Sequence, residues 1–597
     1  MKIIQKLFYL LSNKERRRGA WLLLLIIIMA LIDMIGVASI LPFMAVLTNP
    51  DLVQTNSILN TALELSAIFG VKTNQQFLFL LGIFVFILLV FSISLKALTM
   101  YVQTYFVEKI DYSIGKRLVE GYLHQPYSWF LNRNSAELGK TILSEVSSII
   151  GNGLKPVMEL IGKIFVTFSI LLLLILVDPL LALIVGLTLI LSYGIIYQFS
   201  RAFLKQIGLD RYKANSMRYA AVSEAFGAIK EIKLSGLEKV YTKKFSKPAK
   251  SIAYHSAAMT IVSQLPRFAL EIVAFGGLLL AVLYLMSKSG SFNNAVPIIA
   301  LYAFAGYRLM PALQQIYNSF AQMRFVGPAL DSLYEDIRNI QPSNHNHNKD
   351  KLHLKESITL DQIHYYYPNS SKYVLKNISL NISARSTVAF VGATGSGKTT
   401  TVDIILGLLE AQQGTLKVDG KIISESNRRN WQQSIGYVPQ QIYLADDTIT
   451  ANIAFGINPE NINKVDVERA AKIAELHEFV VNDLLEKYNT VVGERGVRLS
   501  GGQRQRIGIA RALYHNPQLL IMDEATNALD NLTEEVVMRA VNNLSKEITI
   551  ILIAHRLSTV KDCDKIFFLE KGEMNASGKF NELIRTNESF SSMAKKY

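Results

Sequence analysis

The sequence predicts a multidomain membrane protein, in which an all-α membrane domain precedes an α/β domain, and three observations support this fold class. Of the 597 residues, 50% are hydrophobic and 18% are charged, a balance too apolar for an ordinary soluble protein. The long apolar runs all lie before residue 340, and each is long enough to cross a bilayer as a helix. Beyond residue 351, short apolar runs typical of buried strands precede glycine-rich or acidic segments. We therefore expect a membrane domain over 1–340, a polar linker over 341–351 and a second domain over 352–597.

Six membrane-spanning helices are expected in the first domain, which would put both of its ends on the same side of the membrane. Residues 1–11 and the basic cluster after them predict an interfacial elbow helix rather than a secretory signal peptide, because the next apolar run is too long. The expected spans lie at about 20–46, 77–106, 157–177, 180–199, 268–286 and 295–321.

Most basic residues of the first domain lie in two long segments, 108–156 and 200–264. Because cytoplasmic loops carry an excess of Lys and Arg, both segments are expected in the cytoplasm, with the second domain. Each is expected to contain a short crossing helix, at 127–138 and 232–240, and the alternative is a solvated, charged turn. The single cysteine, Cys563, excludes an intramolecular disulfide framework, which fits a cytosolic second domain.

The clearest chemical signal is a glycine-rich loop between an apolar run at 388–391 and a helix predicted at 402–409. A strand, a glycine-rich turn and a helix in this order form a phosphate cradle, since the turn presents successive N–H groups and the helix adds its positive end. In such a loop Lys398 would reach the β and γ phosphates of ATP, and Thr399 would bind Mg²⁺. The alternative is a chance glycine-rich turn. The residues expected to bind the nucleotide here are Gly392, Thr394, Gly395, Ser396, Gly397, Lys398, Thr399 and Thr400.

Two further segments are expected to complete a site for ATP hydrolysis. The apolar run 519–522 predicts a buried parallel strand, after which Asp523 would hold Mg²⁺ through water and Glu524 would polarise the attacking water. A second glycine-rich segment at the start of a predicted helix is suited to binding the γ-phosphate. The alternative interpretation of this segment is that it only caps the helix. Its residues are Ser500, Gly501, Gly502 and Gln503.

Together with Leu499, these four residues read LSGGQ, and here the sequence resembles the ATP-binding-cassette (ABC) family, whose signature this is. The resemblance implies that Gln440 senses Mg²⁺ and contacts the membrane domain, and that His555 holds the γ-phosphate and Glu524 in position. It also implies that Tyr367 stacks on adenine, with a core tyrosine as the alternative.

The family's D-loop is matched by residues 527–530, where Asp530 is expected near the nucleotide and Asn527 stands where the family usually has serine. Six spans followed by one cassette are similar to the half-size exporters of this family. Because one chain carries every catalytic element, two identical chains would form two complete ATP sites, so we expect a homodimer.

Three basic residues in or beside the spans bear on the substrate: Lys96, Arg267 and Arg308. All three are expected in the inner half of the membrane, where a cation faces a cavity, a partner or a headgroup. A ring of such cations suits a phosphate or pyrophosphate headgroup. The structural alternatives are that Arg267 pairs with Glu271 and that Lys96 extends its charge to the membrane surface. Asp33, in the first span, is expected to be a cavity or packing residue.

Outside the cassette the resemblance becomes narrower. Residues 58–69 predict an external amphipathic helix, and together with 263–267 and 306–311 they look like the bacterial lipid-linked oligosaccharide flippases. This implies flipping of a polyprenyl-pyrophosphate-linked oligosaccharide to the outer leaflet of a bacterial inner membrane for protein glycosylation, without a nucleic-acid partner. The alternatives are an exporter of drugs, lipid A or peptides and, from another class, an ATP-gated channel or a membrane ATPase sensor without net transport.

Overall fold

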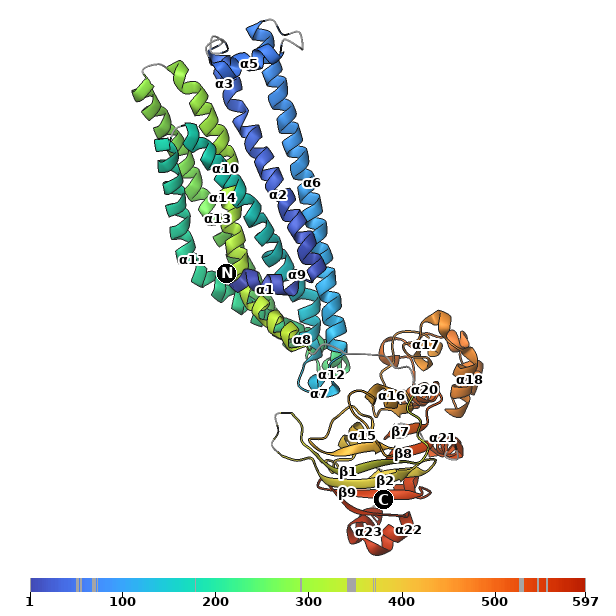
Figure 1. The fold of residues 1–597 in the computed structure, drawn as a ribbon. Coiled ribbons are helices and arrows are strands. Elements are labelled where there is room, and N and C mark those ends of the chain that lie inside the picture. The colour runs from blue at the N-terminus through green and yellow to red at the C-terminus, as the bar shows by residue number, and fades with distance from the viewer. Residues whose placement is uncertain are drawn as a thin grey trace. The chain divides into compact units, whose positions relative to one another are not determined.

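The computed structural model in Figure 1 has a helical part followed by a mixed α/β part, which confirms the predicted fold class. It describes residues 2–49, 53, 56–66, 71, 73–177, 179–289, 292–340, 351–368, 370, 372–525, 531–544, 547–554 and 557–595. The chain divides into two compact units. The first is formed by Met1–Gln125 and Arg133–Ser343, and the second by Pro126–Asn132 and Asn344–Tyr597. Most of the expected linker, 341–350, lies outside the described residues.

The first unit is built from long helices whose starts are fixed by polar caps. Ser12 and Glu15 form a capping box at the start of α2, and Thr73 and Gln76 form another at the start of α6. The helices of this unit are α1 (Lys2–Leu10), α2 (Asn13–Ala38), α3 (Ile40–Thr48), α5 (Ser57–Ser66), α6 (Asn74–Leu123), α8 (Ser135–Lys140), α9 (Val146–Ile149), α10 (Lys155–Val177), α11 (Pro179–Gly227), α12 (Ile229–Ser235), α13 (Glu238–Ser289) and α14 (Phe292–Asn339), with π-helical turns η2 (Thr141–Glu145) and η3 (Ile150–Leu154).

Within the described residues, four helical segments are long and apolar enough to cross a membrane: Asn13–Thr48, Asn74–Leu123, Ser135–Val177 and Gly186–Gly227. The fifth and sixth expected spans fall inside α13 and α14, which have 52 and 48 residues. The total of six spans stays a prediction. The segment expected to form the elbow helix is covered by α1, and α5 covers most of the expected external helix, of which 67–69 lie outside the described residues.

The two expected crossing helices are shorter than their predicted bounds, which were wrong. The first is α7 (Tyr127–Phe130), a helix of 4 residues, because Asn134 caps a new helix by accepting from the Ala136 N–H at 2.9 Å. The second, α12, ends where Gly236 adopts a left-handed conformation with φ of 66°, a C-cap that favours glycine. A new helix, α13, then begins at Glu238.

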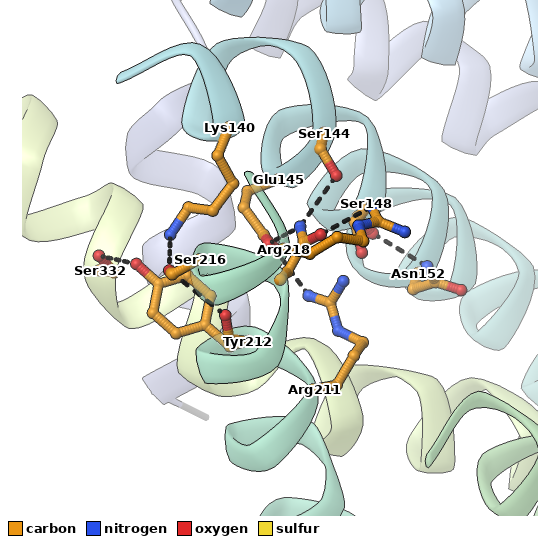
Figure 2. Close-up of polar contacts among 11 residues, drawn as sticks. Lys140, Ser144, Glu145, Ser148, Asn152, Arg211, Tyr212, Ser216, Arg218 and Ser332 are labelled. Carbon is orange, nitrogen blue, oxygen red and sulfur yellow. Dashed lines mark hydrogen bonds and ion pairs between the residues drawn. The ribbon is translucent and has the colours of Figure 1, made fainter. Parts of the chain in front are cut away.

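A network of buried polar side chains joins α8 and η2 to α11 (Figure 2). Glu145, which is 1% exposed, accepts from Arg211 Nη2 at 2.7 Å and from Asn215 Nδ2 at 2.6 Å. Lys140, fully buried, donates to Ser216 Oγ at 2.7 Å and lies over the Tyr212 ring at 4.0 Å from its centroid. The buried charges are therefore met by acceptors or by an aromatic face, which offsets their removal from water.

The second unit contains two sheets, and the larger one brings the glycine-rich loop and the end of the acidic strand to the same edge. The four-stranded antiparallel sheet has the order β2-β1-β4-β5, and the six-stranded sheet has the order β10-β9-β3-β8-β7-β6. In the larger sheet, β9, β3, β8, β7 and β6 are parallel. Every residue of β3, β7 and β8 is buried, as expected for parallel strands covered on both faces.

The strands of this unit are β1 (Ser357–Tyr365), β2 (Leu375–Ser383), β3 (Thr387–Val391), β4 (Gln413–Val418), β5 (Lys421–Ile422), β6 (Ile435–Val438), β7 (Leu519–Asp523), β8 (Thr549–Ile553), β9 (Lys565–Glu570) and β10 (Glu573–Gly578). Its further helices are α15 (Lys398–Ile405), α16 (Arg428–Gln432), α17 (Ile449–Ile453), α18 (Lys464–Ile473), α19 (His477–Asn482), α20 (Gly501–Leu513), α21 (Asn531–Asn543), α22 (Phe580–Thr586) and α23 (Glu588–Lys595), with 3-10 turns η4 (Pro459–Asn461), η5 (Lys487–Asn489), η6 (Glu494–Gly496) and η8 (Leu557–Val560).

The buried Glu145–Arg211 pair is expected to matter far more for stability than an exposed pair. Glu145→Ala leaves Arg211 buried without its counter-charge, which should cost about 3–5 kcal/mol. The matched control is Glu120→Ala: Glu120 pairs with Lys116 at 3.6 Å, and the two side chains are 56% and 57% exposed. The control should cost about 0.5 kcal/mol or less. Thermal unfolding in detergent measures both, and equal unfolding temperatures for the two variants would contradict the structural importance of the network.

Candidate functional site

The glycine-rich loop directly follows β3 and precedes α15, as the sequence predicts. Gly392, Gly395 and Gly397 have φ values of 155°, 79° and 100°, which side-chain-bearing residues rarely adopt. A Cβ at Gly392 would lie 2.2 Å from the Leu569 carbonyl oxygen, so only glycine fits there. At these three positions the loop can turn tightly because there is no side chain to clash. A tight turn of this kind is the shape that a phosphate cradle requires.

Lys398 lies at the start of α15, and its ammonium group turns back over this loop. Its Nζ donates to the Gly392 carbonyl at 2.8 Å and to the Ala393 carbonyl at 3.1 Å. Burial lowers the pKa of Lys398, while the nearby carboxylates of Glu524 and Asp523 oppose that shift. The Ser396 hydroxyl is buried and has no hydrogen-bond partner among the described residues. A confined cation and a buried hydroxyl without a partner among the described residues fit a bound triphosphate.

The parallel strands bring Gln440 and Glu524 together. Val438 of β6 pairs with Met522 of β7, so the residues two positions further along each strand meet at the same sheet edge. Gln440 Nε2 donates to Glu524 Oε2 at 2.7 Å. Glu524 has a φ of 49°, a strained conformation that turns the chain away at the strand end.

Two neighbours of the buried Asp523 carboxylate received no role from the sequence. Burial, and next the Asp523 charge, raise the pKa of Tyr437, whose hydroxyl hydrogen-bonds to that carboxylate. Burial and the same negative charge raise the pKa of Asp403, in α15, to about 6. These residues lie in β6 and after the loop, and only the folded sheet shows that they surround one carboxylate.

The signature segment forms a helix start. Ser500 caps α20, with its Oγ accepting from the Gln503 N–H at 3.2 Å, while the Gln503 side chain accepts from the Ser500 N–H at 2.8 Å. Gly501 and Gly502 are the first residues of α20. The capping role, which was the alternative, is therefore present, and the same exposed helix start keeps N–H groups available to an anion.

Tyr367 lies beside the helix that follows the loop. Its hydroxyl is 3.0 Å from Thr400 Oγ1, and its ring meets Tyr365 edge-on at 5.2 Å. Tyr365 is the buried core tyrosine, whereas Tyr367 is half-buried. Thr394 and Thr399 are exposed on the loop and at the start of α15. Asp530, with Asn527, and His555 lie outside the described residues.

The expected membrane cations do not form one group of equivalent charges. Arg308 Nη1 pairs with Asp33 Oδ1 at 2.9 Å, and Arg267 pairs with Glu271 at 3.0 Å, while Lys96 is exposed. A fourth cation, half-buried Lys163, interacts electrostatically with Lys96, Asp33 and Arg308. It was absent from the expected set although it lies inside the expected span 157–177, where a lysine in an apolar run is a visible signal.

Comparison with known proteins agrees with this architecture. The ABC transporter family matches residues 375–527, and the ABC transporter transmembrane region matches residues 21–309. The leukotoxin export ATP-binding protein LtxB of Aggregatibacter actinomycetemcomitans is 31% identical over 508 residues, which cover 84% of this chain and 70% of LtxB. The alpha-hemolysin translocation ATP-binding protein HlyB of Escherichia coli is also 31% identical, with the same two coverages.

A lipid transporter and a solved exporter structure are also similar to this chain. The ATP-dependent lipid A-core flippase of Saccharophagus degradans is 31% identical over 484 residues, which cover 79% of each chain. A bacterial Atm1-family ABC exporter with ATP bound superposes with a TM-score of 0.78 over 98% of this chain and 99% of that one, at 22% identity. The chain therefore belongs to the ABC transporter family, as a half-size exporter whose helical membrane domain is followed by an ATP-hydrolysing domain that drives transport.

Proposed function

We propose that this exporter flips a polyprenyl-pyrophosphate-linked oligosaccharide from the inner to the outer leaflet of a bacterial inner membrane, for protein glycosylation. The observation that carries this proposal is a set of cations in the membrane helices: Arg308 pairs with Asp33, and Lys163 lies within electrostatic range of Asp33, Arg308 and Lys96. Cations within membrane helices are costly unless they serve a polar path or ligand, and a diphosphate headgroup is such a ligand. A relative named as a lipid A-core flippase supports a lipid substrate.

A protein substrate is the second candidate, because LtxB and HlyB are named for leukotoxin export and alpha-hemolysin translocation. The cationic cluster favours the lipid, since an unfolded polypeptide offers no fixed pair of phosphates to a membrane-embedded arginine. A channel or sensor without net transport would use the same ATP site but would not need a specific headgroup contact.

For ATP hydrolysis, we propose that Glu524 orients and polarises the attacking water while Gln440 holds its carboxylate. Lys398 would exchange its loop carbonyls for phosphate oxygens, and Tyr367 would stack on adenine. Thr399, Gln440 and Asp523 supply the hard oxygen donors that Mg²⁺ prefers, and the ion would neutralise charge that develops on the phosphates.

The remaining site residues are proposed to act across a homodimer. Ser500, Gly501, Gly502 and Gln503 of one chain would face the γ-phosphate held by the loop of the other, with Asp530 and His555 nearby. Members of half-size exporter families work as dimers, and one chain of this protein supplies both halves of the site. The cassettes would lie in the cytoplasm, on the side of the basic segments.

Glu524→Gln should reduce ATP hydrolysis by about 10²- to 10⁴-fold, because the general base is lost while the phosphate cradle remains. ATP binding, measured with a fluorescent analogue, should persist. The matched control is Glu535→Gln, the same change in an exposed carboxylate that pairs with Arg539 on α21. Wild-type turnover in Glu524→Gln would remove this residue from its proposed role.

The substrate proposal is tested by changing Lys96, Lys163 and Arg308 to alanine one at a time, with Arg267→Ala, whose side chain pairs with Glu271, as a comparison. Loss of a charge-assisted contact of roughly 1.5–3 kcal/mol should lower flipping of a fluorescent polyprenyl-diphosphate oligosaccharide about tenfold or more, counted per ATP hydrolysed. Arg308→Lys should be intermediate, since it keeps the charge but loses the planar fork. Proteoliposome assays with the diphosphate lipid, a drug and a peptide measure this, and wild-type flipping in the alanine variants of Lys96, Lys163 and Arg308 would exclude the cationic site.

A further inference from the structure

We propose that Asp33 is a built-in counter-ion: it pairs with Arg308 before substrate binds, and the substrate's diphosphate group takes its place, with Lys163 as an additional cation for the same group. This inference rests on the proposed function and specifies how the membrane site exchanges anions. The sequence predicts Lys96, Arg267 and Arg308 as substrate residues, and neither Asp33 nor Lys163 is among them.

The geometry around Asp33 joins three helices at one oxygen atom. Asp33, in α2, is 8% exposed; its Oδ1 forms an ion pair with Arg308 Nη1 of α14 at 2.9 Å and accepts a hydrogen bond from Ser92 Oγ of α6 at 3.1 Å. Within the described residues, the guanidinium has no other ion pair and no hydrogen bond. A guanidinium carries five N–H donors, so an incoming diphosphate can contact Arg308 before the pair with Asp33 breaks, and the exchange never leaves the arginine without an anion.

The surrounding charges leave room for an incoming anion. Lys163, in α10, is attracted by Asp33 and Glu159 and repelled by Lys96 and Arg308, so all of these groups lie within electrostatic range. Glu159 is engaged by the side-chain amide of Gln315, and no hydrogen bond to Lys163 Nζ occurs among the described residues. Three cations thus face two carboxylates, one of which has its own partner, and the cluster keeps a positive surplus.

Exchange of one anion for another explains why a carboxylate belongs in such a site. A membrane-embedded arginine without any anion is costly, so a site made only of cations would hold its substrate and resist releasing it. Asp33 supplies a replacement anion at the moment of release. The same carboxylate competes with the diphosphate for Arg308, and therefore weakens substrate binding while speeding release.

The test is Asp33→Asn in the full-length protein in proteoliposomes, with three fluorescent probes: a polyprenyl-diphosphate disaccharide, its monophosphate counterpart and a neutral polyprenyl glycoside. For the diphosphate, the half-saturating concentration should fall about tenfold, because the competing anion is lost, and the maximal flipping rate should fall as release slows. The half-saturating concentration for the monophosphate should fall less, and that for the neutral glycoside should not change. Lys163→Met should raise the half-saturating concentration for the diphosphate about tenfold.

Arg308→Gln provides the background that separates exchange from a structural role. Since Asp33 acts through Arg308, adding Asp33→Asn to Arg308→Gln should no longer lower the half-saturating concentration for the diphosphate. The double variant also has no unpaired arginine, which could prevent folding of the single Asp33→Asn variant. A higher half-saturating concentration in Asp33→Asn, or an equal fall in the Arg308→Gln background, overturns the counter-ion proposal. A wild-type protein that does not move the diphosphate probe overturns the proposed function instead.

Discussion

Charge buried among long helices must be met by opposite charge or by several hydrogen-bond donors, and this requirement organises the first unit. The Glu145 carboxylate meets Arg211 and Asn215, so η2 and α11 are held together at a fixed register (Figure 2). Asp33 does the same for α2, α6 and α14 through Arg308 and Ser92. Apolar packing alone would allow these helices to slide, whereas a buried ion pair loses its partner when either helix moves by a turn.

The same edge-of-sheet geometry creates the site of the second unit. β3, β8, β7 and β6 are parallel neighbours, so their carboxyl ends bring together residues that are far apart in the chain. Phe390 pairs with Ile553, which also pairs with Asp523, and this continuous register places the glycine-rich loop beside the acidic strand end. The close contact of Gln440 with Glu524 then follows from strand order rather than from any local sequence feature.

Residues whose role depends on local backbone geometry were predictable from the sequence. The loop glycines, the end of β7 and the cap at Ser500 all lie in the predicted local settings, because each is specified within about ten residues of chain. Contacts between remote helices were not predictable: nothing near Arg308 in the sequence indicates Asp33 as its partner. The predicted bounds of the crossing helices were wrong for another reason: Asn134 begins a new helix and Gly236 ends one, both inside segments that were predicted to be continuous helices.

The cation of the ATP site, Lys398, and the membrane cation Arg308 are held by different kinds of acceptor, and the difference fits the roles proposed for them. Lys398 donates to two neutral carbonyl oxygens of its own loop, which compete weakly with a polyphosphate. Arg308 is paired with a full carboxylate, which competes strongly. A motor that must capture ATP benefits from weak internal competition, whereas the proposed membrane site, which would release an anion on the far side of a membrane, would benefit from a strong one. On this proposal the choice of acceptor, carbonyl or carboxylate, would set how readily each site gives up its ligand.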